Sequence, residues 1–253
     1  MHQEAVVRVN DEVTEPAIIG RGVRQGCLLS PILFSIYAEM MMIEALDGIE
    51  EGVPVGGVLQ KDIKFADDRA MVASSEDGLQ KMMDSLDVTG RRYDMKINVK
   101  KTKTMRISRR GGVKLHIEMY GNTVEQVKKF RYLGALVTED GRCEAEIKAR
   151  VAMAKRFSII KESCMLTQRM DRKLKKQIIK SVLWSVALYG SETWTMRKKE
   201  VERIQAFEMW IWRKMEKISW RDRMSNEVLR LVKEKRSIMN IITERKKGGL
   251  VTF

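Results

Sequence analysis

Phe65-Ala66-Asp67-Asp68 places two adjacent carboxylates between short, mainly apolar runs at residues 63–65 and 70–73. Neighbouring side chains of a straight strand point to opposite faces, so two adjacent aspartates can converge on one point only where the chain turns. Aspartate is a preferred turn residue. We therefore expect a β-hairpin whose turn holds Asp67 and Asp68.

Such a turn is a candidate metal site. Two carboxylates a few ångströms apart resist joint ionisation unless a cation neutralises them. The cations Mg²⁺ and Mn²⁺ prefer oxygen ligands of this kind. A solvated loop tip is the alternative interpretation, and this tetrapeptide alone leaves both open.

A glycine-containing loop lies upstream, between Gly22 and Ser30-Pro31. Glycine lets a backbone approach a ligand closely. Ser30 is a suitable helix cap with Pro31 at the first helical position, and a helix N-terminus suits a phosphate. The predicted helix carries an apolar stripe at helical spacing, formed by Ile32, Leu33, Ile36, Tyr37 and Met40. A capped core helix after an ordinary loop is the alternative.

Further local patterns predict the elements around these segments. Residues 5–9 and 13–19 are typical of an antiparallel hairpin. Ser74 is expected to cap a helix that ends near residue 90, with an apolar face formed by Leu79, Met82, Met83 and Leu86. Short strands are expected at residues 104–108, 113–120 and 128–137.

A cluster of lysines between these elements, at residues 96–103, includes Lys101. A lysine near a departing phosphate can neutralise its charge or donate a proton to it. A solvated basic turn is the alternative.

Four motifs follow one another along the chain: Gly-Val-Arg-Gln-Gly-Cys-Leu-Leu-Ser-Pro at 22–31, Phe-Ala-Asp-Asp at 65–68, Ile-Asn-Val-Lys-Lys-Thr at 97–102 and Tyr-Leu-Gly at 132–134. In this order and at this spacing they resemble the palm of reverse transcriptases from non-LTR (LINE-type) retrotransposons. The resemblance covers roughly residues 5–137. It implies an α+β fold, in which a polymerase palm fragment, an antiparallel sheet packed by helices, precedes an all-helical thumb-like region.

The resemblance also implies roles for individual residues. Asp67 and Asp68 match the paired catalytic aspartates that hold Mg²⁺ (or Mn²⁺), and Lys101 matches a catalytic lysine near the triphosphate. The implied nucleotide- and template-binding residues are Arg24, Gln25, Gly26, Ser30, Pro31, Phe65 and Ala66. The implied primer grip is Tyr132, Leu133 and Gly134. The implied partners are an RNA template, a DNA primer and deoxynucleoside triphosphates.

The sequence departs from the family pattern in ways that affect activity. The family's third metal ligand is an aspartate on a strand well before the glycine-containing loop, and this chain begins too late to contain it. Leu28 stands where the family has proline, and Asp94-Met95 stands where it commonly has Gly-Leu. We therefore expect a truncated copy that polymerises poorly or not at all by itself.

The remainder of the chain is helical and basic in pattern. Helices are expected over residues 144–161, 173–189 and 201–218, with a last helix capped by Ser225. Its tryptophans could stack on bases, but at helical spacing they are more typical of a core. We expect residues 1–137 to form the palm fragment and residues 138–253 a thumb- or connector-like region.

Composition narrows the classes of partner. The chain has 253 residues, of which 44% are hydrophobic and 32% charged, which is typical of a folded protein. Its formal net charge of +14 favours a polyanionic partner. The three cysteines form no Cys-x-x-Cys pair, and no stretch is long and apolar enough to span a bilayer. We expect an intracellular protein, in the nucleus or cytoplasm, that is neither secreted nor in a membrane.

Two rival functions remain open from the sequence. The chain could be a non-catalytic remnant that binds nucleic acid through its positive charge. It could also be a basic helical interaction protein with no nucleic-acid role. Salt-dependent RNA binding separates these two, because release of counterions from the phosphates weakens binding as salt rises.

Overall fold

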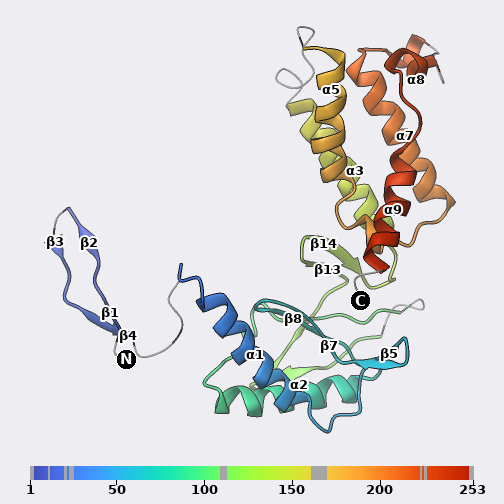
Figure 1. Ribbon diagram of the computed structural model, residues 1–253. Coiled ribbons are helices and arrows are strands. Elements are labelled where there is room, and N and C mark those ends of the chain that lie inside the picture. The colour runs from blue at the N-terminus through green and yellow to red at the C-terminus, as the bar shows by residue number, and fades with distance from the viewer. Residues whose placement is uncertain are drawn as a thin grey trace. The chain divides into compact units, whose positions relative to one another are not determined.

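A computed structural model describes residues 3–10, 12–19, 22, 26–108, 113–160, 170–222, 224 and 227–250 (Figure 1). The chain divides into two compact units. The first comprises Met1–Thr104 and Lys114–Glu125, and the second comprises Met105–Val113 and Gln126–Phe253. Each unit has its own hydrophobic core.

The N-terminal residues form the predicted antiparallel hairpin, in two short ladders. Strand β1 (Gln3–Ala5) pairs with β4 (Ala17–Ile19), and β2 (Arg8–Val9) pairs with β3 (Glu12–Val13). The hairpin is therefore confirmed.

Helix α1 (Ser30–Leu46) begins where the Ser-Pro pair predicts, but Ser30 is not its cap. The cap position is Leu29, whose backbone already has right-handed helical angles (φ −85°, ψ −21°). Because the chain turns helical before Ser30, the serine becomes the first helical residue and Pro31 follows it in the first turn.

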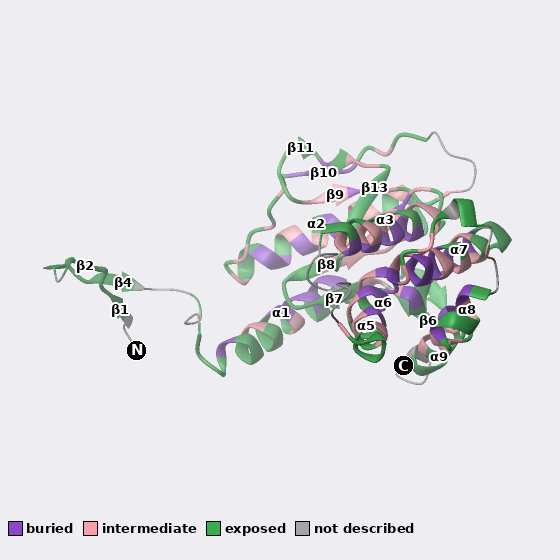
Figure 2. Ribbon diagram, turned by 90° about the horizontal axis from the view of Figure 1, so that it is seen from above, coloured by how far each residue is buried: buried purple, intermediate pink, exposed green. Residues whose placement is uncertain are grey.

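The alternative interpretation of α1 as a core helix holds for its second half, which contributes Met41, Met42, Ala45 and Leu46 to a core, but the Ile32 to Met40 stripe does not face that core. Those five residues are 45–57% exposed, whereas the buried residues are Ser30, Ala38, Met41, Met42, Ala45 and Leu46. Figure 2 shows that α1 carries both exposed and buried stretches. Helix α1 is apolar on more than one side, and α2 packs on the side that carries Met42 and Ala45. Periodicity alone cannot choose between two apolar sides of one helix.

Four strands lie between α1 and α2: β5 (Val53–Val55), β6 (Val58–Gln60), β7 (Asp62–Phe65) and β8 (Asp68–Met71). They form two antiparallel hairpins, β5–β6 and β7–β8. Two of the four strands, β7 and β8, flank the pair of adjacent aspartates.

Helix α2 (Glu76–Arg92) buries Met82, Met83 and Leu86 of the predicted apolar face, which is therefore confirmed. Its cap is Ser75, whose hydroxyl accepts a hydrogen bond from the Gly78 amide at 3.0 Å, and not Ser74. Helix α2 packs on α1 and contacts β10. Met41 and Met42 of α1 and Met82 and Met83 of α2 contribute to the core of the first unit.

Short strands follow α2: β9 (Lys103–Thr104), β10 (Glu118–Met119), β11 (Asn122–Thr123) and β12 (Glu125–Gln126). Strand β10 pairs with β11, and β9 pairs with β12. The longer strands expected at 104–108 and 113–120 are therefore wrong in extent.

A hairpin replaces the single strand expected at residues 128–137. Strand β13 (Lys129–Tyr132) pairs antiparallel with β14 (Ala135–Thr138), and Leu133 and Gly134 form the turn. Both turn residues have positive φ, 47° and 79°, as a two-residue turn of the mirror-image type requires. Gly134 adopts its positive φ without steric cost, so the chain can turn here although the surrounding residues are typical of a continuous strand.

Helices make up most of the second unit, as predicted (Figure 1). They are α3 (Glu144–Ile160), α5 (Arg172–Ile178), a π-helical turn (Ile179–Leu183), α6 (Trp184–Ala187), a 3₁₀ turn (Ser191–Thr193), α7 (Lys198–Met215), a second 3₁₀ turn (Trp220–Asp222), α8 (Glu227–Val232) and α9 (Ile238–Leu250). The expected last helix is two helices, and its expected cap, Ser225, lies outside the described residues. Among the described helices, none has the length and apolar character needed to cross a membrane.

The tryptophans of the second unit belong mainly to its core. Trp184, Trp194 and Trp212 are buried, and Trp184 contacts both Trp212 and Phe207 edge-to-face at centroid distances of 5.7 and 5.8 Å. The core interpretation of these three residues is confirmed. Trp210 is half-buried and stacks on Phe207.

Candidate functional site

The adjacent aspartates lie at the tip of the β7–β8 hairpin. Phe65 pairs with Asp68 across the ladder, so the turn residues are Ala66 and Asp67, and Asp68 opens β8. Ala66 has a φ of 53°, an uncommon conformation for a residue with a side chain. Phe65, Ala66 and both aspartates are exposed. The expected hairpin is thus present, with its turn one residue earlier than predicted.

Two exposed carboxylates at a turn suit a hydrated divalent cation. Mg²⁺ keeps several waters and is commonly held by one or two carboxylates together with substrate phosphates, so this donor set fits it. Among the residues that the structure describes, no group of three or more His, Cys, Asp or Glu side chains could hold a metal ion. Within the described part of the chain, the two aspartates therefore stand without a third such side chain beside them.

An ion-pair cluster ties this hairpin to α1. Lys64 and Arg69, which face each other across the ladder, both pair with Glu39 of α1, and Arg69 also pairs with Asp62 at 3.2 Å. The hydrogen bond from Lys64 is the largest cause of the lowered pKa of Glu39. A shallow pocket beside the turn is lined by Ser35, Ile36, Glu39, Met40, Lys64, Ala66 and Arg69.

The glycine-loop residues lie at the start of α1. Gly26 and Pro31 are exposed, and Ser30 is buried. The pocket beside the aspartate turn begins at Ser35 on α1, so none of these three lines it. Arg24 and Gln25 lie outside the described residues.

Lys101 lies in a turn that Asn98 organises. The carbonyl of Asn98 accepts hydrogen bonds from the amides of Lys101 and Thr102 at 3.0 and 2.9 Å. The Asn98 side chain accepts a further bond from the Lys101 amide at 3.2 Å. The backbone of this turn is therefore fixed, while Lys101 itself is exposed.

Tyr132, Leu133 and Gly134 lie at the β13–β14 turn, in the second unit. Sequence patterns missed three side chains that contact this turn, Glu146, Arg150 and Tyr189. They also missed Glu39. The spacing of Glu146 and Arg150 is the one local signal that was available, because oppositely charged residues four apart on a helix are neighbours.

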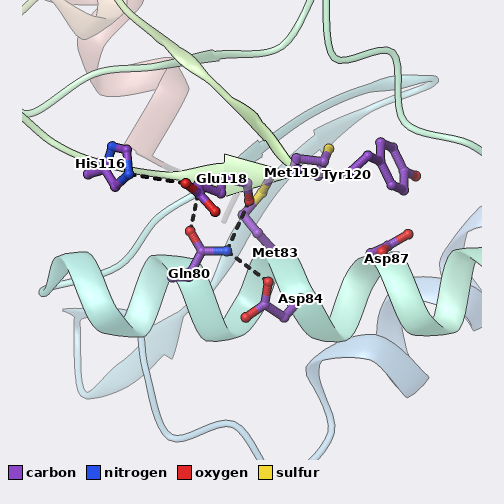
Figure 3. A pocket seen from close by; sticks show the side chains of 9 residues that line it. Gln80, Met83, Asp84, Asp87, His116, Glu118, Met119 and Tyr120 are labelled. Atoms are coloured by element: carbon purple, nitrogen blue, oxygen red, sulfur yellow. Dashed lines mark hydrogen bonds and ion pairs between the residues drawn. The ribbon is translucent and has the colours of Figure 1, made fainter.

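A second pocket lies in the first unit, between α2 and β10 (Figure 3). The Gln80 carboxamide bonds both the amide and the carbonyl of Glu118, at 2.8 and 2.9 Å, and so joins helix to strand. The lining of this pocket is acidic, with Asp84, Asp87 and Glu118. Carboxylates repel phosphates, and none of the predicted site residues lines this pocket.

Comparisons with known proteins match the chain to one family. The family model described as reverse transcriptase (RNA-dependent DNA polymerase) matches residues 2–137. The RNA-directed DNA polymerase from mobile element jockey of Drosophila melanogaster is 24% identical over 192 residues, which are 72% of this chain and 20% of that protein.

Two further relatives come from transposons. A protein of Drosophila melanogaster named "Probable RNA-directed DNA polymerase from transposon BS" is 25% identical over 216 residues, which are 80% of this chain and 23% of that protein. A Caenorhabditis elegans protein, named as transposon-derived and uncharacterized, is 25% identical over 201 residues, which are 77% of this chain and 71% of that protein. The chain thus spans less than a quarter of each Drosophila relative.

Proposed function

Because this chain belongs to the reverse transcriptase (RNA-dependent DNA polymerase) family of non-LTR mobile elements, we propose that its parent chemistry is RNA-templated DNA synthesis. The substrates would be an RNA template, a DNA primer and deoxynucleoside triphosphates. The protein would act in the nucleus or cytoplasm. The single observation that carries the proposal is the β7–β8 turn, which presents Asp67 and Asp68 within the segment that matches the family.

The chain's own residues would divide the work as follows. Asp67 and Asp68 would hold Mg²⁺ or Mn²⁺, which when bound activates the primer 3′-hydroxyl and neutralises charge on the leaving pyrophosphate. Exposed Lys101 would neutralise the triphosphate or give it a proton. Tyr132, Leu133 and Gly134 would grip the primer end.

The remaining assignments follow the same family pattern. Arg24, Gln25, Gly26, Ser30, Pro31, Phe65 and Ala66 would contact the template and the incoming nucleotide. Residues 1–137 would act as the palm fragment and residues 138–253 as the thumb-like region.

We further propose that this chain alone polymerises poorly or not at all. A two-metal site needs enough carboxylates to compensate the cation charge, and two exposed aspartates compensate only part of it. No third carboxylate joins them among the described residues. The alternative function, favoured by the net charge of +14 together with this partial site, is nucleic-acid binding without catalysis.

Primer extension on an RNA template tests both proposals. The wild type is compared with Asp67→Ala/Asp68→Ala, first with Mg²⁺ and then with Mn²⁺. Asp47→Ala, an exposed aspartate after α1, is the matched control. Extension that the double change abolishes and the control retains would support the site and refute the predicted inactivity.

RNA binding decides between the remaining outcomes. No extension by any variant, with binding that weakens steeply between 50 and 200 mM salt, would support the non-catalytic alternative. If about six phosphates are neutralised, the affinity should fall on the order of 10³-fold over that range. Binding that does not change with salt would refute a nucleic-acid role altogether.

A further inference from the structure

The β13–β14 turn is held by three side chains that belong to none of the family motifs. The Tyr189 hydroxyl donates to the Leu133 carbonyl at 2.8 Å, and the Arg150 guanidinium donates to the Gly134 carbonyl. The amide of Leu136, just after the turn, donates to Glu146 Oε2 at 2.9 Å. Side chains therefore bind both carbonyls of the turn and the amide of the second residue of β14.

These three side chains also bind one another. Arg150 Nε donates to Glu146 Oε1 at 2.6 Å, and the guanidinium carbon lies 4.4 Å from the centroid of the Tyr189 ring. The Arg150 and Glu146 side chains are only 10% and 6% exposed. A buried ion pair that also binds the exposed Tyr189 ring has little freedom to rearrange, so it can define the position of the backbone that it binds.

The turn itself is in a conformation that needs such support. Leu133 has a φ of 47°, which is unfavourable for a residue with a branched side chain. A side-chain carbon in place of a Gly134 α-hydrogen would lie 3.4 Å from the Tyr189 ring, so the ring packs directly against the turn. Strained backbone persists only where surrounding contacts over-determine it, and such places cluster at functional sites.

We propose that Tyr189, Arg150 and Glu146 are positioning residues that hold the Leu133–Gly134 turn in the shape that binds a primer 3′ end. This inference rests on the proposed function of that turn as the primer grip. In a trans peptide the amide points away from the carbonyl that precedes it. With the Leu133 carbonyl on Tyr189, the Gly134 amide is directed away from that hydroxyl, and in the proposed role it would donate to a phosphate of the primer.

Tyr189→Phe is the most selective variant, because it removes the hydroxyl and keeps the ring over Arg150. Its matched control is Tyr37→Phe in the other unit, where the hydroxyl also donates to a backbone carbonyl, that of Tyr93, at 2.8 Å. The two tyrosines are similarly exposed, at 48% and 45%. Glu146→Gln serves as a second variant, since it keeps the shape and removes the charge.

Hydrogen–deuterium exchange of the full chain tests whether Tyr189 and Glu146 hold the turn, whatever the turn binds. Tyr189→Phe and Glu146→Gln should speed amide exchange in residues 129–138 about two- to tenfold, the range expected for one lost hydrogen bond. Tyr37→Phe should leave exchange in this segment unchanged. Unchanged exchange in both Tyr189→Phe and Glu146→Gln would overturn the inference.

Binding to two fluorescent RNA–DNA hybrids of equal length, one with a recessed DNA 3′ end and one blunt, tests the positioning role. The wild type and Tyr37→Phe should prefer the recessed end. Tyr189→Phe should reduce that preference about two- to tenfold and leave blunt-hybrid affinity unchanged. A purely structural contact would not alter this ratio.

The outcomes separate the inference from the proposed function. Faster exchange with an unchanged end preference would overturn the positioning role and leave the primer grip standing. No end preference in the wild type would refute the primer grip, and the positioning role with it. Faster exchange together with a lost preference would support both.

Discussion

At the residue scale, surroundings decide what a charge contributes. Helix α3 carries two ion pairs of the same i, i+4 spacing, Glu146–Arg150 and Glu144–Lys148. The first pair is almost fully buried, whereas the side chains of the second are about half exposed, at 45% and 52%. An exposed pair is screened by water, but removing one partner of a buried pair leaves an uncompensated charge inside the protein.

Glu146→Ala should therefore lower the free energy of unfolding of the second unit by about 3 kcal/mol, the lower part of the range for a broken buried pair. It also leaves the Leu136 amide without its acceptor. Urea denaturation followed by tryptophan fluorescence reports on this unit, because Trp184, Trp194, Trp210, Trp212 and Trp220 all lie in it.

Glu144→Ala is the control on the same helix and should change the urea midpoint little. Equal losses in the two variants would contradict the argument, because they would show that burial makes no difference to these pairs.

At the element scale, a helix and a hairpin are joined through one carboxylate. Glu39 of α1 binds Lys64 of β7 and Arg69 of β8, next to the turn that carries Asp67. Met71 of β8 also packs against the core to which α1 contributes, and Lys61, just before β7, donates to the Leu46 carbonyl. Among these contacts, the one through Glu39 depends on an ionisable carboxylate.

Acid should loosen this contact. The pKa of Glu39 is lowered in the folded protein, mainly by its hydrogen bond with Lys64, so folding favours the ionised form. The resulting stabilisation is fully present above the ordinary glutamate pKa of about 4.3 and is lost as the pH falls through the lowered pKa. Amide NMR signals of β7 and β8 should shift in that window.

Glu39→Gln should reduce this pH-dependent shift, with the remainder coming from the aspartates of the hairpin itself, while Glu50→Gln, an exposed glutamate outside the contact, should leave it unchanged. If the shift is as large in Glu39→Gln as in the wild type, the assignment of Glu39 fails.

At the scale of the whole molecule, the two units have cores of different chemistry. The core of the first unit is rich in methionine, with Met41, Met42, Met82, Met83 and Met119. The core of the second is larger and contains Trp184, Trp194, Trp212 and Phe207. Methionine is flexible and specifies packing weakly, whereas aromatic side chains bury more area each.

The chain should therefore unfold in two steps, with the first unit at the lower urea concentration. Far-UV circular dichroism follows both units and tryptophan fluorescence follows only the second, so the two curves should not coincide. Coincident curves with one midpoint would mean that the units unfold as one cooperative system.

Local patterns in the sequence were enough to predict several parts of this protein. The hairpin at Asp67-Asp68, the buried face of α2 and the helical second half all follow from turn preferences and apolar periodicity, which act over a few residues. The ordered motifs were enough to indicate the family, which the match over residues 2–137 confirms.

Contacts between distant segments determine which side of α1 is buried and how the β13–β14 turn is held. Both sides of α1 are apolar, so the packing of α2 made the choice. The turn depends on Tyr189, which lies 56 residues from Leu133 along the chain. Arg150 has a local partner in Glu146, four residues before it, but its other partners, the Gly134 carbonyl and the Tyr189 ring, come from segments that no local pattern relates to it.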